Sequence, residues 1–198
     1  MLVDPELLLS YGAETVTFVA GDVIFEEGEI PKFYYQIESG RIKLNHYDEE
    51  GRELILALLT KGFSVCELLL FIDERYPVNA VVFEPSVVLR LPKSKFIQLL
   101  DDHPKISRDI NKFLSERLYS KYIMLENNSS PSAEVRINGV LDYHKSFSSE
   151  QDQFAFELPI TRQQLAAMTG LRVETVIRTI KKLEQKDVLK IINRKIYY

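Results

Sequence analysis

Apolar and β-prone residues come in short runs over the first half of the chain, and turn signals separate the runs. The runs cover residues 15–19, 23–25, 33–37, 41–47, 54–59, 78–83 and 87–91. Within residues 41–47, RIKLNHY, polar and apolar positions alternate, which is typical of a half-buried strand. Glycines at positions 21, 28, 40, 51 and 62 fall between the runs, where turns need them. Many short strands favour an antiparallel roll or barrel, preceded by a short helix that begins at Asp4-Pro5 and ends near Gly12.

The hydrophobic spacing changes to that of helices from residue 93 onwards. We expect a short helix at 93–100 and then a long helix from Pro104 to about Glu126, started by the acids and the proline of 101–104. The long helix carries one apolar stripe, formed by Ile106, Ile110, Phe113, Leu114, Leu118, Tyr122 and Leu125. Such a stripe can pack on the roll or can form an interface with a second copy of the chain. A hinge at 127–131, a helix at 133–147 and a loop at 148–153 are expected to follow.

Residues 158–186 have the signals of two short helices joined by a sharp turn. Thr161 and Gln164 have the spacing of a capping box, and Ile160 and Leu165 have that of the matching hydrophobic staple. The first helix is therefore expected from 161 to about 168. Gly170 then permits the left-handed backbone that a sharp turn needs.

The second helix of this pair is predicted to have two opposite faces. An apolar stripe at i, i+4, i+7 is formed by Val176, Ile180 and Leu183. The same spacing occurs two positions earlier in a charged row formed by Glu174, Arg178 and Lys181. Because a shift of two residues is about 200° of helical rotation, this row faces away from the apolar stripe. This is the layout of a DNA recognition helix, in which Arg bonds guanine and Glu accepts from cytosine. An ordinary ion pair between Glu174 and Arg178 is the alternative.

The last residues predict a β-hairpin. Runs at 188–192 and 195–198 are separated by Asn193 and Arg194, a two-residue turn in which Asn tolerates positive φ. Arg194 and Lys195 at the tip can contact phosphate, or they can simply be a solvated turn.

Charge is distributed unevenly along the chain. The net charge of −4 alone argues against nucleic-acid binding. However, residues 1–128 hold 14 Lys+Arg and 21 Asp+Glu, a net of −7, whereas residues 160–198 hold 9 Lys+Arg and 3 Asp+Glu, a net of +6. An acidic body with a basic C-terminal part suits a sensor attached to a DNA reader.

Composition excludes several kinds of site. The single cysteine, Cys66, excludes an intrachain disulfide and a four-thiolate iron–sulfur cluster. The three histidines, at 46, 103 and 144, have no metal-ligand spacing, so no metal site is expected. The N-terminus lacks the basic region of a signal peptide, and the longest apolar run, 54–59, is far shorter than the ~20 residues of a membrane span. We therefore expect a cytoplasmic protein with no membrane partner.

Residues 159–189, PITRQQLAAMTGLRVETVIRTIKKLEQKDVL, closely resemble the winged helix-turn-helix of the CRP/FNR transcription regulators, and GLRVETVIR resembles the FNR branch. The resemblance implies that Glu174 and Arg178 read a G·C pair in a TGA-like half-site. Val173 and Ile177 stand where other members have Arg and Ser. Phosphate contacts are implied for Thr161, Arg162 and Thr175. The full candidate DNA-binding set is Thr161, Arg162, Arg172, Val173, Glu174, Thr175, Ile177, Arg178, Lys181, Arg194 and Lys195.

The first half of the chain resembles the cyclic-nucleotide-binding roll of the same family, beginning with the pattern F-x-x-G-x-x-I-F-x-x-G at 18–28. Residues 64–83 lie where the family has its phosphate-binding cassette. Glu67 and Leu68 match that cassette, but Cys66 replaces its Gly, and Tyr76 and Pro77 replace its Arg-Ser pair. We therefore do not expect cAMP binding, and the cavity favours an apolar effector or none. The candidate effector pocket consists of Phe63, Glu67, Leu68, Arg75, Tyr76, Lys121 and Tyr122.

These observations predict an α+β fold with an N-terminal antiparallel β-roll, a jelly roll of the cyclic-nucleotide-binding type. A long dimerisation helix and a C-terminal winged helix-turn-helix follow. The expected domains are a sensor roll at 1–100, the dimerisation helix at 101–127 and the DNA-binding domain at 128–198.

The predicted function is a sequence-specific transcription regulator that binds double-stranded DNA as a homodimer through the helix 104–126. RNA polymerase is a further candidate partner. One alternative is a ligand-binding regulatory module without DNA binding. Another is a roll-fold enzyme such as a cupin, which needs clustered His and Glu ligands, whereas His46 stands alone on its strand. We therefore do not expect an enzyme.

Overall fold

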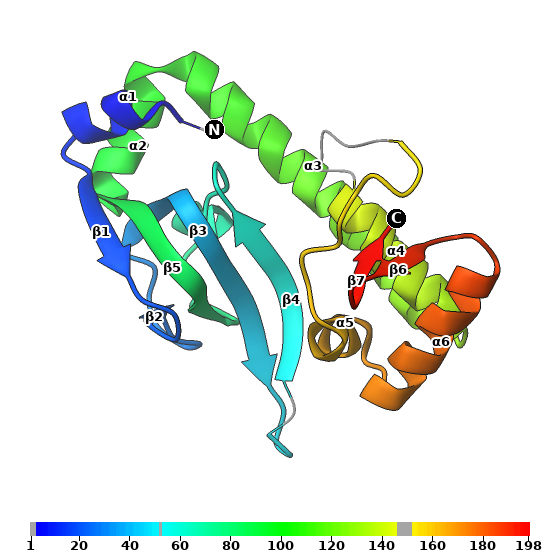
Figure 1. Cartoon of the computed structure of the whole chain (residues 1–198). Helices are drawn as coiled ribbons and strands as arrows, with labels where there is room; N and C mark the ends of the chain where they lie inside the picture. The colour runs from blue at the N-terminus through cyan, green and yellow to red at the C-terminus, as the bar shows by residue number, and fades with distance from the viewer. Residues whose placement is uncertain (1–2, 52, 146–151) are drawn as a thin grey trace. The chain divides into compact units, whose positions relative to one another are not determined.

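In the computed structural model, which describes residues 3–51, 53–145 and 152–198, two long strands form the centre of the N-terminal sheet (Figure 1). The sheet consists of β1 (Glu14–Phe18), β2 (Val23–Phe25), β3 (Phe33–Tyr47), β4 (Glu53–Thr60) and β5 (Asn79–Pro92). Its order is β1-β5-β3-β4, with β2 also paired to β5, and all of these pairs are antiparallel. The predicted antiparallel roll is confirmed.

The strands β3 and β5 each replace two predicted strands, so the predicted breaks at 38–40 and 84–86 were wrong. Both strands instead continue through these positions, and the register of their pairing shifts between Ile37 and Ile42. Gly40 has φ +86°, and a Cβ there would lie 2.5 Å from the Pro85 carbonyl oxygen. The glycine thus serves a bulge in a continuous strand rather than a turn between strands, because the neighbouring strand passes too close for a side chain.

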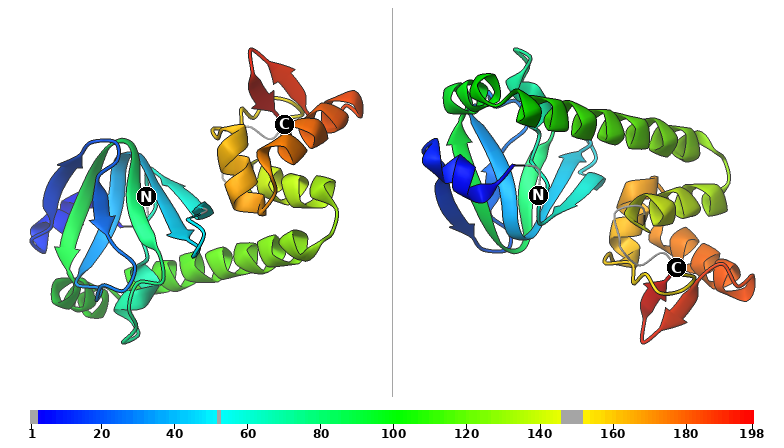
Figure 2. Two further views of the ribbon diagram at one scale, coloured as in Figure 1. Left: turned by 90° about the horizontal axis from the view of Figure 1, so that it is seen from below. Right: turned by 90° about the horizontal axis from the view of Figure 1, so that it is seen from above.

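Helices close one end of the roll (Figure 2). The short helix α1 (Pro5–Ser10) begins at Asp4, whose carboxylate accepts from the Glu6 amide at 2.8 Å. Together with α2 (Lys93–Asp102) it packs on a cluster that includes Tyr34 and Phe96, whose rings stack with centroids 4.1 Å apart. A short 3₁₀ helix, η1 (Glu67–Leu70), was not predicted.

The long helix α3 (Pro104–Ser129) divides its apolar stripe into two halves. The first half packs against the cluster at the end of the roll through Ile106, Ile110 and Leu114. The second half exposes apolar side chains, with exposed fractions of 54% for Leu118, 62% for Tyr122 and 69% for Leu125. Packing on the roll is therefore confirmed for the first half of the stripe, and the interface with a second copy stays a prediction for the second half.

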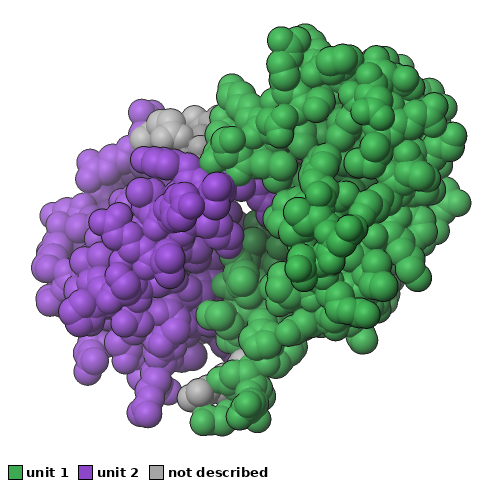
Figure 3. Space-filling model, turned by 180° about the vertical axis from the view of Figure 1, so that it is seen from behind, with its two compact units in different colours: residues 1–116 green, residues 117–198 purple. Residues whose placement is uncertain are grey.

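The chain forms two units, residues 1–116 and residues 117–198 (Figure 3). The division falls within α3. The second unit contains α4 (Ala133–Lys145), α5 (Arg162–Thr169), α6 (Val173–Gln185) and the hairpin of β6 (Lys190–Ile192) and β7 (Lys195–Tyr197). The predicted helix-turn-helix and wing are confirmed. The predicted end of α4 at 147 and most of the predicted loop at 148–153 lie outside the described residues. No helix in the described part of the chain is long and apolar enough to cross a membrane.

The predicted hinge at 127–131 was wrong at its start, because Asn127, Asn128 and Ser129 belong to α3. The Asn128 side-chain amide donates to the Met168 carbonyl at 3.3 Å, at the end of α5. This bond between elements holds a turn-prone residue in the helix, so the chain leaves the helix only at Ser130.

Candidate DNA-binding surface

The position of α5 is fixed by caps at both of its ends. The Thr161 hydroxyl accepts from the Gln164 amide at 3.2 Å, and the Gln164 side-chain oxygen accepts from the Thr161 amide at 2.8 Å. Gly170 follows the helix with φ 65° and ψ 22°, in the left-handed region. The predicted capping box and glycine turn are both confirmed, and they determine where α6 can begin.

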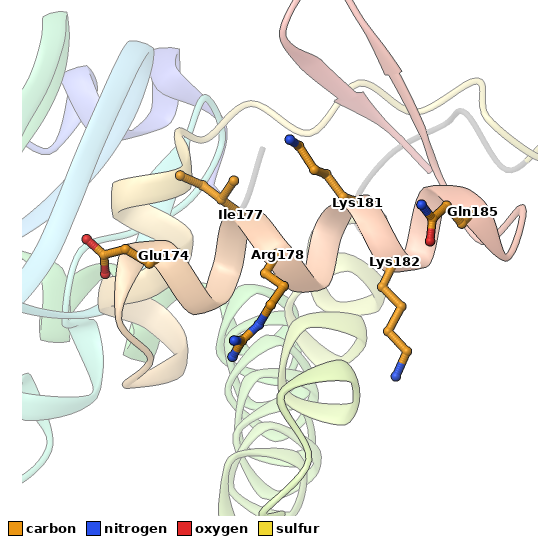
Figure 4. A pocket seen from close by; sticks show the side chains of 6 residues that line it. All are labelled: Glu174, Ile177, Arg178, Lys181, Lys182 and Gln185. Atoms are coloured by element: carbon orange, nitrogen blue, oxygen red, sulfur yellow. The ribbon is translucent and has the colours of Figure 1, made fainter.

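The two predicted faces of α6 are present, and Figure 4 shows side chains of the outward one. Val176, Ile180 and Leu183 are at most 1% exposed and pack inside the second unit. Glu174 and Arg178 are exposed on the outward face, one helical turn apart. Within the described part of the chain, these two side chains form no ion pair with each other, and Figure 4 shows them pointing in different directions. The alternative of an ordinary i, i+4 ion pair is therefore not what the structure contains.

A groove of about 720 Å³ runs along the outward face of α6. It is lined by Glu174, Ile177, Arg178, Lys181, Lys182 and Gln185. Two of these residues, Lys182 and Gln185, were not in the predicted set. Each lies four residues after a predicted member, Arg178 or Lys181, so helical spacing alone could have identified them.

Two lysines of this region are held by a carboxylate on α4. The Glu134 carboxylate lies 2.5 Å from the Lys182 ammonium and 2.7 Å from the Lys186 ammonium. Hydrogen bonds from Lys182 and then from Lys186 lower the pKa of Glu134. The positive charge of these two lysines is therefore partly balanced within the protein.

The wing has the predicted two-residue turn, in which Asn193 (φ 49°) and Arg194 (φ 67°) are both left-handed. The Arg162 guanidinium, at the start of α5, donates to the Arg194 carbonyl and so ties the wing tip to the helix-turn-helix. Lys195 lies 2.6 Å from Glu157, and hydrogen bonding to this carboxylate raises the pKa of Lys195. Both side chains are exposed, but Lys195 is already paired with Glu157, so Arg194 is better placed for an outside anion.

The remaining predicted residues flank these features. Thr161 and Arg172, the residues that precede α5 and α6, are exposed, whereas Val173 and Thr175 in the first turn of α6 are half-buried. A second groove lies between α6 and the wing. It is lined by Arg162, Ile177, Ile180, Lys181, Ile191 and Arg194.

The candidate effector residues lie in different surroundings. Tyr76 is 3% exposed and its ring stacks on Phe25 inside the roll, with centroids 3.6 Å apart. Arg75 is exposed and donates to the Gly28 carbonyl at 2.7 Å. Cys66 keeps a left-handed backbone (φ 54°), the conformation that the family's glycine would favour.

The other five candidates also differ in burial and in the unit to which they belong. Glu67 is fully buried, whereas Leu68 is 43% exposed. Phe63 packs on the interior cluster of the roll, and its ring centroid lies 5.6 Å from that of Phe113. Lys121 and Tyr122 belong to the second unit. Among the described residues, no group of three or more His, Cys, Asp or Glu side chains could hold a metal ion.

Comparison with known families assigns both units. Residues 15–103 match the model of the cyclic nucleotide-binding domain, and residues 136–197 match that of the Crp-like helix-turn-helix domain. The fumarate and nitrate reduction regulatory protein of Vibrio cholerae is 27% identical over 86% of this chain and 69% of its own length. The cAMP-activated global transcriptional regulator CRP of Salmonella typhimurium is 28% identical over 84% of this chain and 80% of its own.

A solved structure has the same architecture. A CRP/FNR-family transcriptional regulator from Thermus thermophilus superimposes with a TM-score of 0.70 at 26% identity, covering 93% of this chain and 92% of that one. The roll and the winged helix-turn-helix thus define a DNA-binding transcription regulator. The chain belongs to the CRP/FNR family, whose members are transcription regulators rather than enzymes.

Proposed function

We propose that this regulator binds a palindromic DNA site with a TGA-like half-site core as a homodimer. In this proposal, residues 1–100 are the sensor, 101–127 the dimerisation helix and 128–198 the DNA-binding domain. The observation that carries the proposal is the outward face of α6. It presents an exposed carboxylate and an exposed guanidinium one turn apart, and a buried apolar face holds the helix in place.

Glu174 and Arg178 are proposed to read one G·C pair. A guanidinium can bond O6 and N7 of guanine together, and a carboxylate can accept from N4 of the paired cytosine. Helix spacing of i, i+4 puts their Cβ atoms about 5–6 Å apart, which suits two groups that address the two halves of a single base pair. Thr161, Arg162, Thr175 and Arg194 are proposed to contact phosphate, which positions the reader without specifying sequence.

The dimer is proposed to form through the second half of α3. Leu118, Tyr122 and Leu125 repeat at i, i+4, i+7 and are all more than half exposed. A contiguous apolar row on a surface marks an interaction site more often than scattered exposed residues do. Two copies joined along such a row would present two recognition helices, as a palindromic site requires.

The roll is proposed not to bind cAMP, although the name of the relative from Salmonella typhimurium describes a cAMP-activated protein. A cyclic phosphate needs a cation and amide donors that face the cavity. Here Arg75 is exposed and already donates to a backbone carbonyl, while the Tyr76 ring fills part of the roll's interior. The relative from Vibrio cholerae is named for fumarate and nitrate reduction instead. Because the two relatives have similar identity to this chain, identity alone does not favour cAMP as its ligand.

Titration of labelled duplexes tests the proposal. A palindrome with two TGA-core half-sites is compared with a scrambled duplex of the same length at the same salt concentration, because salt alone changes affinity strongly. We expect the palindrome to bind at least ~10³-fold more tightly, with two chains per duplex. Equal affinity for both duplexes would favour a ligand-binding module without DNA recognition.

A further inference from the structure

Ile177 places an apolar side chain on the outward face of α6, among charged neighbours (Figure 4). It is 42% exposed, with Glu174 one turn before it and Lys181 one turn after it. Figure 4 shows its side chain pointing to the same side of the helix as Lys181 and away from Arg178. The groove that contains the proposed base-reading residues therefore has one wall that can neither donate nor accept a hydrogen bond.

The same side chain also lines the groove between α6 and the wing, which has a volume of about 360 Å³. There Ile177 continues an apolar floor formed by Ile180, which is 1% exposed, and Ile191. The polar members of this groove are the cations Arg162, Lys181 and Arg194. This arrangement suits DNA whose phosphates lie against the three cations while the edge of a base faces the isoleucines.

The chemistry of the major groove restricts what Ile177 can face. A base-edge donor or acceptor pressed against isoleucine loses its water without gaining a partner, which is unfavourable. Thymine differs because its C5-methyl group is the apolar group that the major groove offers. We propose that Ile177 reads the methyl group of a thymine close to the G·C pair assigned to Glu174 and Arg178. This inference rests on the proposed function.

The position of that thymine follows from helix geometry. The Cβ atoms of Ile177 and Glu174, three residues apart, are about 5–6 Å from each other. Successive base pairs are separated by about 3.4 Å. The thymine therefore lies within about two base-pair steps of the G·C pair, on either strand of the half-site.

Replacement of thymine by deoxyuridine tests this directly, because it removes only the methyl group. Each thymine of the half-site is replaced in turn, symmetrically in both half-sites, and the dissociation constant is measured at fixed salt. At one position we expect about a four-fold loss for each half-site, the effect of one buried methyl group. At that position, 5-methylcytosine should bind better than cytosine by a similar factor.

Two variants assign the effect to the side chain. Ile177→Ala should bind the thymine and deoxyuridine duplexes equally while still preferring the palindrome over scrambled DNA. Ile192→Ala, which truncates a 48% exposed isoleucine on β6, should keep the full deoxyuridine effect. If wild-type protein prefers the palindrome but no deoxyuridine position changes its affinity, the inference is overturned and the proposed function stands. If palindrome and scrambled DNA bind equally, both are overturned.

Discussion

Burial removes His144 from the pH range in which a histidine ordinarily titrates. Desolvation in the second unit lowers the pKa of His144 to about 4, because the charged imidazolium loses its water. The unfolded chain binds a proton at this residue below about pH 6.5, whereas the folded chain does not until about pH 4. Folding stability should therefore be complete above pH 6.5 and should fall as the pH drops towards 4, by up to about 3 kcal/mol.

Proton NMR of the imidazole rings measures this pKa in the full chain. The His144 resonances, assigned by their loss in His144→Gln, should keep their neutral positions down to about pH 5. The same substitution should remove part of the decrease in unfolding free energy between pH 7 and pH 5. A midpoint near 6.5 for this ring would show that the side chain is solvated.

Single residues also show what local sequence signals can and cannot predict. The Thr161–Gln164 capping box was predictable because both of its bonds are local to one helix end. Gly40 was assigned to a turn because a glycine between two β-prone runs ordinarily marks one. Its real role depends on Pro85, which is distant in the sequence and close in the fold, so no local pattern could reveal it.

At the scale of elements, a carboxylate on α4 balances part of the positive charge at the end of α6. Glu134→Gln would release Lys182 and Lys186, both of which now lie within hydrogen-bonding distance of the Glu134 carboxylate. Affinity for any DNA sequence should rise, and the plot of log K against log salt should steepen by about 0.9 for each further phosphate that the released lysines neutralise. Binding to scrambled DNA over a range of salt concentrations measures the slope.

A control substitution on the same helix distinguishes the release of the two lysines from the change in the net charge of the protein. Asp142→Asn removes one negative charge from α4, but its partner is the Tyr198 hydroxyl at 2.6 Å rather than a lysine. It should leave the salt slope of the wild-type protein unchanged. The same slope for both variants would mean that net charge alone sets the affinity.

The long helix α3 shows that one apolar stripe can be buried along one half and exposed along the other. Its apolar stripe was recognisable from the sequence, but periodicity does not tell which neighbour a stripe contacts. The division between a half that packs on the roll and a half that stays exposed depends on where the roll ends, and that is a property of the tertiary structure.

Leu118→Glu should dissociate the proposed dimer. A charge in an apolar interface is costly unless it is paired, so the dissociation constant of the dimer should rise at least ~10-fold. Sedimentation equilibrium should give twice the 23.0 kDa of one chain for the wild-type protein and a mass nearer to one chain for the variant. Leu54→Glu, at a 44% exposed leucine on β4, should remain a dimer. A monomeric wild-type protein at micromolar concentration would contradict the proposed interface.

At the scale of the whole molecule, an acidic N-terminal part is joined to a basic winged helix-turn-helix, and this asymmetry was visible from the sequence alone. The family, the roll and the helix-turn-helix were also predictable, because their motifs are local and closely spaced. The surroundings of the effector candidates were not, because their burial depends on contacts between distant strands, such as the stack of Tyr76 on Phe25.

Addition of cAMP tests the sensor assignment. A ligand at about 100 times its dissociation constant stabilises the folded state by roughly 2.7 kcal/mol, which corresponds to a rise of several degrees in Tm. We expect cAMP at about 1 mM to raise the Tm by less than ~1 °C, no more than AMP does at the same concentration. A rise of several degrees with cAMP alone would show that the roll binds it without the Arg-Ser pair.

Glu174 and Arg178 are proposed to read one G·C pair, and combining the substitution Arg178→Ala with a change of that base pair tests this proposal. The affinities of wild-type protein and Arg178→Ala are measured on the palindrome and on the same duplex with that G·C pair changed to A·T in both half-sites. The wild-type protein should lose about 1–3 kcal/mol for each changed pair, whereas Arg178→Ala should lose clearly less, because only the Glu174 contact to that pair remains. Arg162→Ala should bind both more weakly but keep the wild-type difference, because a phosphate contact carries no sequence information. An unchanged preference for G·C in Arg178→Ala would show that Arg178 does not read this base pair.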